Sequence, residues 1–176
     1  DYIIHFSATV KADNFQKMAI YYTKTKDFES FTYPQLFFEK ECGVFDSHLV
    51  KIDGTYHLFY KTSAKPLMNM HETSKELFGT WQHDFDFQNY MASLYRPGSH
   101  EAATTYILPD GKWCLMLDFF GCEKEKMGYV PFISEKAGDA HFHQVNQLFS
   151  FPYGFKHGKV IEISDEEYKK NNELFQ

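Results

Sequence analysis

Short stretches in which apolar and polar residues alternate recur along the whole chain. In residues 49–61 (LVKIDGTYHLFYK) an apolar run is followed by an Asp-Gly pair and then by an aromatic-rich alternating run. Residues 105–118 (TYILPDGKWCLMLD) repeat the pattern. An Asp-Gly pair between alternating runs is the typical signal of a β-hairpin. The sequence therefore predicts two hairpins built on one plan.

A second repeated pattern follows each hairpin. A further strand leads to Ser or Thr, then to a short polar stretch, and then to an aromatic residue that opens a fourth strand. The three instances are residues 25–31 (TKDFESF), 74–81 (SKELFGTW) and 134–142 (SEKAGDAHF). Four short antiparallel strands at a spacing of about 50 to 60 residues are typical of a β-propeller blade. One such sheet cannot bury both faces without a neighbour on each side.

The chain is therefore predicted to be all-β, as a single partial β-propeller domain over residues 1–176. It has about three blades plus the first strand of a fourth. The predicted blades cover residues of about 1–40, which lack the innermost strand, 43–92 and 97–149. A plain β-sandwich with hairpins at ordinary spacing is the alternative.

The C-terminal part, 157–174, is predicted to hold that last inner strand, at 157–163, and a short helix. Ser164 followed three residues later by Glu167 forms a capping-box pattern, which marks a helix start. The helix should run to about residue 173.

The composition restricts the fold and the classes of binding partner. Aromatic residues make up 19% of the chain, which indicates a large aromatic core and strands. The formal net charge is −6 and Arg96 is the single arginine, so the basic stripe needed for nucleic acid or an anionic membrane surface is lacking. No apolar run is long enough to cross a bilayer.

Cys42, Cys114 and Cys122 form an odd set without metal-type spacing. They are interpreted as buried free thiols, which favours a reducing, cytoplasmic compartment. The first residues carry neither an initiator Met nor a signal-peptide pattern and read as the middle of a strand. The chain therefore looks like a fragment or a trimmed piece of a longer protein.

Candidate chemistry sits where the innermost strands begin, because these positions meet at the mouth of a propeller channel. They hold Asp46, Glu101 and His157, and the neighbouring Phe45 and His100 are candidates for substrate contact. Two converging carboxylates repel each other's charge, so one keeps its proton and can act as a general acid. As alternatives, Asp46 caps a turn and His157 is a hydrogen-bonded turn residue.

Four stretches carry a resemblance to a known family. They are, in order, residues 21–28 (YYTKTKDF), 45–61 (FDSHLVKIDGTYHLFYK), 101–105 (EAATT) and 153–160 (YGFKHGKV). In this order they resemble glycoside hydrolase family forty-three, and the resemblance covers nearly the whole chain. Members are five-bladed propellers that include α-L-arabinofuranosidases, β-xylosidases and arabinanases.

The resemblance implies roles for the candidate residues. Glu101 matches the general acid, although the family usually continues Glu-Gly-Pro and this chain has Glu-Ala-Ala. Asp46 matches the carboxylate that orients the acid and tunes its pKa. His157 matches a histidine that lines the pocket floor and in some members approaches a bound ion. The family's general base has no counterpart, because its blade would lie upstream of Asp1.

The resemblance thus implies inverting hydrolysis of arabinosyl or xylosyl bonds in a pentose-containing oligosaccharide or glycan, with the base on the missing N-terminal part. No cofactor is required, and a channel ion such as calcium is compatible with this function. Open blade faces would dock the missing part or a second copy.

Two other readings stay open at this point: a carbohydrate-binding or structural propeller piece without chemistry, and a protein-interaction propeller of the kelch type. No metal site is predicted. Histidines 71, 83, 141 and 143 lack metal-ligand spacing and are assigned to the surface or to turns.

Overall fold

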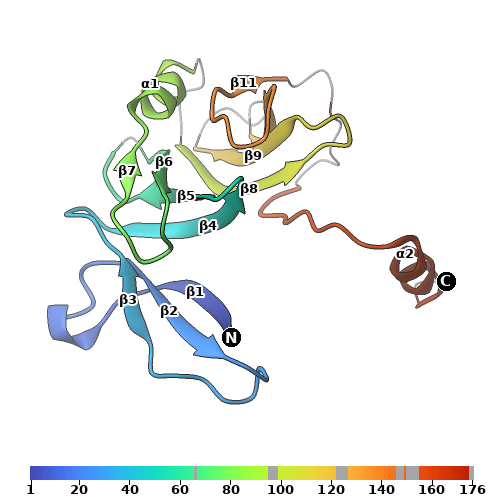
Figure 1. Ribbon diagram of the computed structural model, residues 1–176. Helices are drawn as coiled ribbons and strands as arrows, with labels where there is room; N and C mark the ends of the chain where they lie inside the picture. Colours follow the sequence, from blue (N-terminus) through green and yellow to red (C-terminus); the bar gives the residue numbers. More distant parts are fainter. Residues whose placement is uncertain (66, 95–98, 122–126, 146–148, 150–154, 175–176) are drawn as a thin grey trace.

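The computed structural model describes residues 1–65, 67–94, 99–121, 127–145, 149 and 155–174. Three antiparallel sheets follow one another along the chain, so the predicted all-β class is confirmed (Figure 1). A β-sandwich has two sheets packed face to face, so the three successive sheets argue against the sandwich alternative. The predictions that involve Arg96, Cys122 and residues 153–154 lie outside the described residues.

Each sheet is a meander whose strands pair in chain order. Sheet A consists of β1 (Tyr2–Ala8), β2 (Ala19–Thr25) and β3 (Gln35–Phe38), with the 3-10 helix η1 (Lys11–Asp13) between β1 and β2. Sheet B consists of β4 (Val44–Ile52), β5 (Thr55–Thr62), β6 (Asn69–Ser74) and β7 (Gln82–His83). Sheet C consists of β8 (Ser99–Ile107), β9 (Trp113–Phe120), β10 (Gly128–Ser134) and β11 (His143–Gln144). The helices are α1 (Phe85–Ser93) and α2 (Asp165–Leu174).

The predicted hairpin turn between β4 and β5 forms at Asp53 and Gly54. Ile52 pairs directly with Thr55, and the two turn residues have φ of 47° and 77°. Such a two-residue turn needs positive φ at both positions, which Gly adopts without a steric penalty and Asp tolerates. The Asp-Gly pair thus fixes the register of the hairpin.

The second repeated pattern is a set of hydroxyl-capped turns. Thr25 Oγ1 accepts from the Phe28 N–H at 2.9 Å, Ser74 Oγ accepts from the Glu76 N–H at 3.2 Å, and Ser134 Oγ donates to the Lys136 carbonyl at 3.3 Å. Ser74 and Ser134 end the third strands of sheets B and C, whereas Thr25 ends the second strand of sheet A. Sheet A therefore lacks the innermost strand of the repeat, as predicted. The exact blade boundaries stay a prediction.

The main core lies between sheets B and C. Phe59, Trp113 and Phe132 are fully buried there, and helix α1 contributes Phe87 and Met91. The sequence reading missed α1. Its N-terminus is capped by Asp84, whose side chain accepts from the Phe87 N–H at 2.9 Å, which is the usual role of Asp at this position.

The predicted strand at 157–163 is not formed. These residues pair with no described strand, and a strand is defined by such ladder bonds. The helix that follows is confirmed with its capping box, because the Ser164 N–H donates to Glu167 Oε2 at 2.8 Å and the Glu167 N–H donates to Ser164 Oγ at 3.3 Å. Helix α2 buries none of its residues and stands away from the sheets (Figure 1).

Cys42 and Cys114 are free thiols; Cys114 is buried and Cys42 half-buried. The assignment of His71 to the surface or a turn is wrong. It is fully buried in β6, where Asp84 and His57 hydrogen-bond its two ring nitrogens. In the described part of the chain, no helix has the length and apolar character needed to span a membrane.

Candidate functional site

Sheets B and C carry the same irregularity on their innermost strands. In β4 the register shifts between Phe45 and His48, and in β8 it shifts between Glu101 and Thr104. Each shift places one extra residue in the inner strand, which is a β-bulge. Bulges bend a strand and re-aim side chains, and they are frequent next to active sites.

The bulges explain the position of the two predicted carboxylates. Asp46 lies inside β4 and Glu101 inside β8. The prediction that they stand where the inner strands begin is therefore wrong by a few residues. Asp46 has a φ of 52°, and Ala102, which follows Glu101, has a φ of 53°. Left-handed conformations cost a non-glycine residue about 1–2 kcal/mol. Ala102 takes this conformation at the position where the resembling family usually has Gly.

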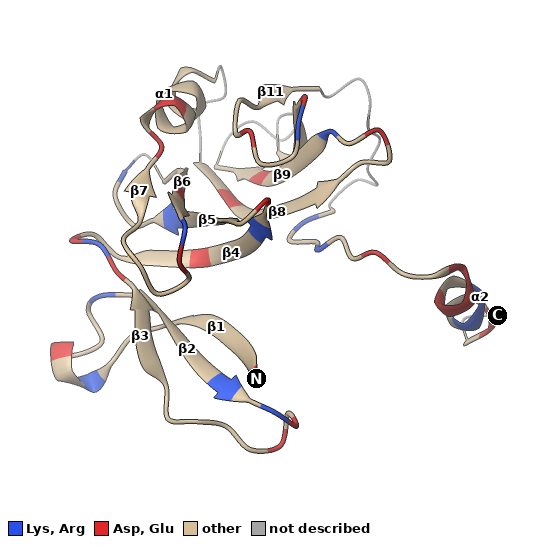
Figure 2. Cartoon of the chain, viewed as in Figure 1, with Lys and Arg blue, Asp and Glu red and all other residues tan. Residues whose placement is uncertain are grey.

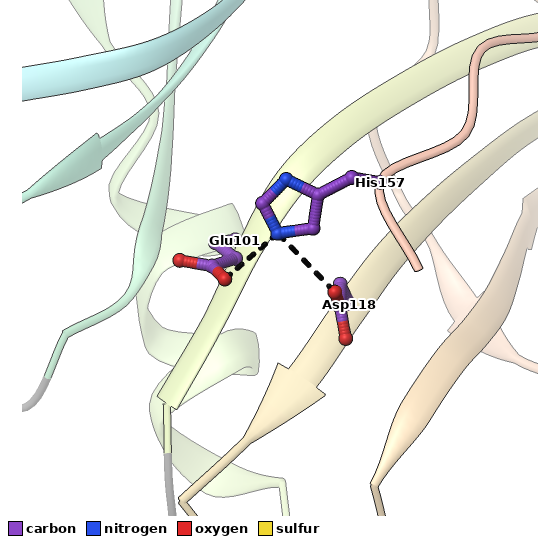
Figure 3. A group of neighbouring side chains, drawn as sticks. All are labelled: Glu101, Asp118 and His157. Carbon is purple, nitrogen blue, oxygen red and sulfur yellow. Dashed lines mark hydrogen bonds and ion pairs between the residues drawn. The ribbon is translucent and has the colours of Figure 1, made fainter. Parts of the chain in front are cut away.

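Glu101 is the centre of a network of charges. Its Oε1 lies 2.9 Å from His157 Nε2, and its Oε2 accepts from Lys61 Nζ. The same His157 nitrogen lies 3.3 Å from Asp118 Oδ2. Figure 3 shows the imidazole between the two carboxylates. Because an ionised carboxylate only accepts hydrogen bonds, Nε2 carries the proton in this arrangement.

Lys61 belongs to this site although the sequence reading did not select it. It comes from β5 and is buried. Its Nζ lies 5.0 Å from the centre of the Phe45 ring and 4.4 Å from the centre of the Phe120 ring. An ammonium group between two ring faces gains cation–π attraction. Phe45, a predicted substrate contact, therefore contacts the site through Lys61.

Asp118 was missed as well. It is fully buried in β9, where it pairs directly across the ladder with Glu101. Lys156 Nζ lies 3.7 Å from its Oδ2. Asp118 ends the second repeat of the hairpin pattern at the position that Lys61 occupies in the first. This shared position, at the end of an apolar run, was the available signal for both residues.

The pKa values of the carboxyl groups move apart. Burial alone would raise the pKa of Glu101, but the hydrogen bonds from Lys61 and His157 outweigh it, and the pKa is lowered. Burial, and then the Glu101 charge, raise the pKa of Asp46. Burial also raises the pKa of Asp118, against the attraction of Lys156 and His157. Glu101 therefore loses its proton at lower pH than Asp46 or Asp118.

Asp46 lies on the bulge of β4, close enough to the same site that, after burial, the charge of Glu101 raises its pKa and the charges of Lys61 and His157 lower it. His157 is half-exposed at the side chain and reaches Glu101 from the segment before α2. His100 is not brought together with them. It is buried, and its Nδ1 accepts from the Asn69 N–H at 3.1 Å. Because neighbours in a strand face opposite sides, a site on the Glu101 side leaves His100 in the core.

Figure 2 shows that acidic positions on β4, β8 and β9 lie close to a basic position on β5. The ligand atoms of Glu101, Asp118 and His157 lie within 4.8 Å of one another, a separation that one cation could bridge. Lys61 and Lys156 already supply positive charge to these two carboxylates. We therefore describe the group as an ion-pair network of the chain itself.

The three meandering sheets, and the carboxylates on the bulged inner strands of sheets B and C, define a propeller-type protein with a polar site between these strands. The same fold appears in the crystal structure of a thermostable family-43 glycoside hydrolase, with a TM-score of 0.54 and 13% sequence identity. The match covers 81% of this chain and 49% of that one. This chain therefore spans about half the length of the solved relative.

The family follows from the sequence itself. Residues 1–169 match the family described as a probable glycosyl hydrolase domain related to family 43, and the chain belongs to this family. Among curated proteins, no relative matches the chain.

Proposed function

We propose that this chain carries part of the active site of a glycoside hydrolase that cleaves arabinosyl or xylosyl linkages with inversion. The observation that carries the proposal is the convergence of Glu101 and Asp46 from equivalent bulges of neighbouring sheets. Paired carboxyl groups with pKa values pushed apart are the chemistry that glycosidic cleavage needs. The family assignment supports glycosidase-like chemistry. The pentose specificity rests on the resemblance of the sequence motifs.

In this proposal Glu101 protonates the leaving oxygen and Asp46 holds and tunes it. Because Glu101 is ionised in the present arrangement, it must gain a proton first. In its imidazolium form His157, whose Nε2 lies 2.9 Å from Glu101 Oε1, can supply this proton. Substrate entry that separates Lys61 from Glu101 would raise the Glu101 pKa and favour this transfer. The general base comes from a part of the protein outside these 176 residues.

The test is hydrolysis of aryl arabinofuranoside and aryl xyloside at high protein concentration. The parent chain is compared with Glu101→Gln, and with Glu135→Gln as a control at an exposed glutamate that directly follows β10. Loss of a general acid lowers the rate by roughly a hundredfold to ten-thousandfold. Because the general base lies outside this chain, the parent should turn over slowly, and the proposal predicts that Glu101→Gln alone lowers this slow rate by that factor, with binding of xylo- or arabino-oligosaccharide retained. No detectable hydrolysis by the parent would contradict an acid role that this chain carries without its base.

A second candidate is a carbohydrate-binding propeller piece without hydrolysis. One observation favours it: both oxygens of Glu101 are engaged by Lys61 and His157. This candidate predicts equal oligosaccharide binding by parent and Glu101→Gln, and no hydrolysis by either. Oligosaccharide binding that is absent from both proteins would contradict both candidates.

A further inference from the structure

Asn69 is a fully buried residue whose side-chain amide is unpaired. It is the first residue of β6 and pairs directly with Lys61 of β5 across the ladder. Within the described part of the chain, neither its Oδ1 nor its Nδ2 has a hydrogen-bond partner, although none of the residue is exposed. An unpaired buried polar group destabilises a protein. Such a group in a folded chain therefore calls for a specific explanation.

The ladder places this amide beside the side chain of Lys61. Directly paired residues of neighbouring strands lie on one face of the sheet, with Cβ atoms about 4.5–5.5 Å apart. In the structure the Lys61 ammonium donates to Glu101 Oε2. Because it ends a flexible four-carbon stem, it can turn either toward Glu101 or toward Asn69. These two residues are thus alternative partners for one buried ammonium.

Asn69 offers an acceptor to Lys61, whereas its neighbour His100 does not. The Asn69 backbone N–H donates to His100 Nδ1 at 3.1 Å, so neutral His100 carries its proton on Nε2 and can only donate there. Burial, and then the charge of Lys61, lower the pKa of His100 to about 4. His100 is therefore neutral near neutral pH, and the Lys61 charge lies close to this pair. The acceptor opposite Lys61 is Asn69 Oδ1.

The proposed reaction requires a second partner for the Lys61 ammonium. Glu101 has to be protonated before it can act as an acid, and a protonated carboxyl group no longer carries the charge that holds the ammonium. Among the described residues, the other titratable groups that face Glu101 are Asp118 across the ladder, His157 and Asp46. A charged group that is left buried without a partner is costly.

We propose that Asn69 is a positioning residue for the general acid: its Oδ1 accepts a hydrogen bond from the Lys61 ammonium when Glu101 is protonated. Lys61 then has two positions. On ionised Glu101 it keeps the acid deprotonated, and on Asn69 it leaves the carboxyl group free to hold a proton and to meet the glycosidic oxygen. The catalytic meaning of this movement rests on the proposed function, but the movement itself needs no substrate.

The first test is NMR spectroscopy of the parent and of Glu101→Gln, which imitates the protonated acid near neutral pH. In the parent, Lys61 Nζ lies 5.0 Å from the Phe45 ring centre and 4.4 Å from the Phe120 ring centre, so ring currents should displace the signals of the Lys61 ε-protons. In Glu101→Gln these signals should move toward their ordinary positions, and nuclear Overhauser contacts to the Asn69 amide protons should appear. Unchanged Lys61 signals in Glu101→Gln would overturn the proposal.

The second test is urea unfolding of Asn69→Leu in the parent and in Glu101→Gln. Removing an unpaired amide from the parent should leave the urea midpoint unchanged or raise it. In Glu101→Gln the same substitution removes the partner of Lys61 and should lower the midpoint. As the matched control, Thr104→Val takes another unpaired buried polar atom out of β8 and should shift the midpoint equally in both backgrounds.

An equal shift by Asn69→Leu in both backgrounds would overturn the proposal. This is also the result expected if Asp46, whose pKa the Lys61 charge lowers against the effect of burial, received the ammonium instead. Neither experiment measures hydrolysis. Failure of this inference is therefore distinguishable from failure of the proposed function.

Discussion

Sheets B and C share one backbone plan and differ at the positions where their inner strands bulge. Phe45 and Asp46 of sheet B correspond to Glu101 and Ala102 of sheet C. Within sheet C, Glu101 lies directly across from Asp118, and like charges in such a pair destabilise a sheet.

The other sheet supplies the compensation. Lys61 of sheet B stands at the repeat position of Asp118 and donates to Glu101, while Lys156 and His157 approach from the segment before α2. The repeated backbone pattern therefore places the equivalent positions close together. The opposite charges at one such position, Lys61 in sheet B and Asp118 in sheet C, build the ion-pair network around Glu101. Neither sheet holds this site alone.

The largest predicted effect concerns a core position that the repeat shares. Trp113 of sheet C is fully buried, whereas its counterpart Tyr56 is half-buried with Lys51 Nζ 4.6 Å from its ring centre. Trp113→Ala should lower the free energy of unfolding by about 3–5 kcal/mol, and Tyr56→Ala by about 1 kcal/mol. Urea unfolding measures both. Equal losses would show that the two sheets do not share the core in the way described.

The next largest effect is a pH dependence of the free energy of unfolding that comes from a histidine of sheet B. His57 is buried at the position that Cys114 takes in sheet C, and burial, with the nearby His71 and Lys75, lowers its pKa from 6.5 to about 4. Below about pH 6.5 the unfolded chain binds a proton that the folded chain refuses. Stability should therefore fall as pH drops from 6.5 toward 4, by about 1.4 kcal/mol per unit of pKa difference.

His57→Cys, which copies sheet C, should reduce this slope in urea unfolding measured across that pH range. The residual slope should come from His48 and His100, whose pKa values burial lowers to about 3 and about 4, and from His5, whose pKa burial also lowers. An unchanged slope in the variant would mean that His57 is not the neutral buried group described.

The smallest effect tests the bulge itself. Ala102→Gly should raise the free energy of unfolding by about 1 kcal/mol, because Gly relieves the left-handed strain. Ala103→Gly, one residue further in β8, is the matched control and should be destabilising by about 0.5–1 kcal/mol. A loss of stability in Ala102→Gly, measured by urea unfolding, would argue against the positive φ at this position.

Much of the fold was predictable because it is encoded locally. The Asp53–Gly54 turn, the hydroxyl-capped turns and the Ser164 capping box depend on neighbouring residues alone. Helix α1 could also have been predicted, since Asp84 is a suitable cap and Phe87 and Met91 recur at helical spacing. The segment at 157–163 was read as a strand because an alternating pattern does not reveal whether a partner strand is present.

The site was only partly predictable for a related reason. Glu101, Asp46 and His157 could be selected because each starts or precedes a repeated pattern. Lys61 and Asp118 could not be paired with Glu101 from sequence, because their contacts depend on how two sheets pack and on the bulge that turns Glu101. His100 was predicted to contact substrate, but it is the strand neighbour of Glu101. A displacement by one residue along a strand moves a side chain to the opposite face, and His100 therefore points into the core.

The central claim is that Lys61 of one sheet holds Glu101 of the next sheet ionised. It is tested most directly by NMR titration of the Glu101 carboxyl carbon, over the pH range in which the chain stays folded, in the parent and in Lys61→Met. Glu101 should titrate below the ordinary value of 4.5 in the parent and move upward in the variant. A Glu101 midpoint at or above 4.5 that Lys61→Met leaves unchanged would contradict the account.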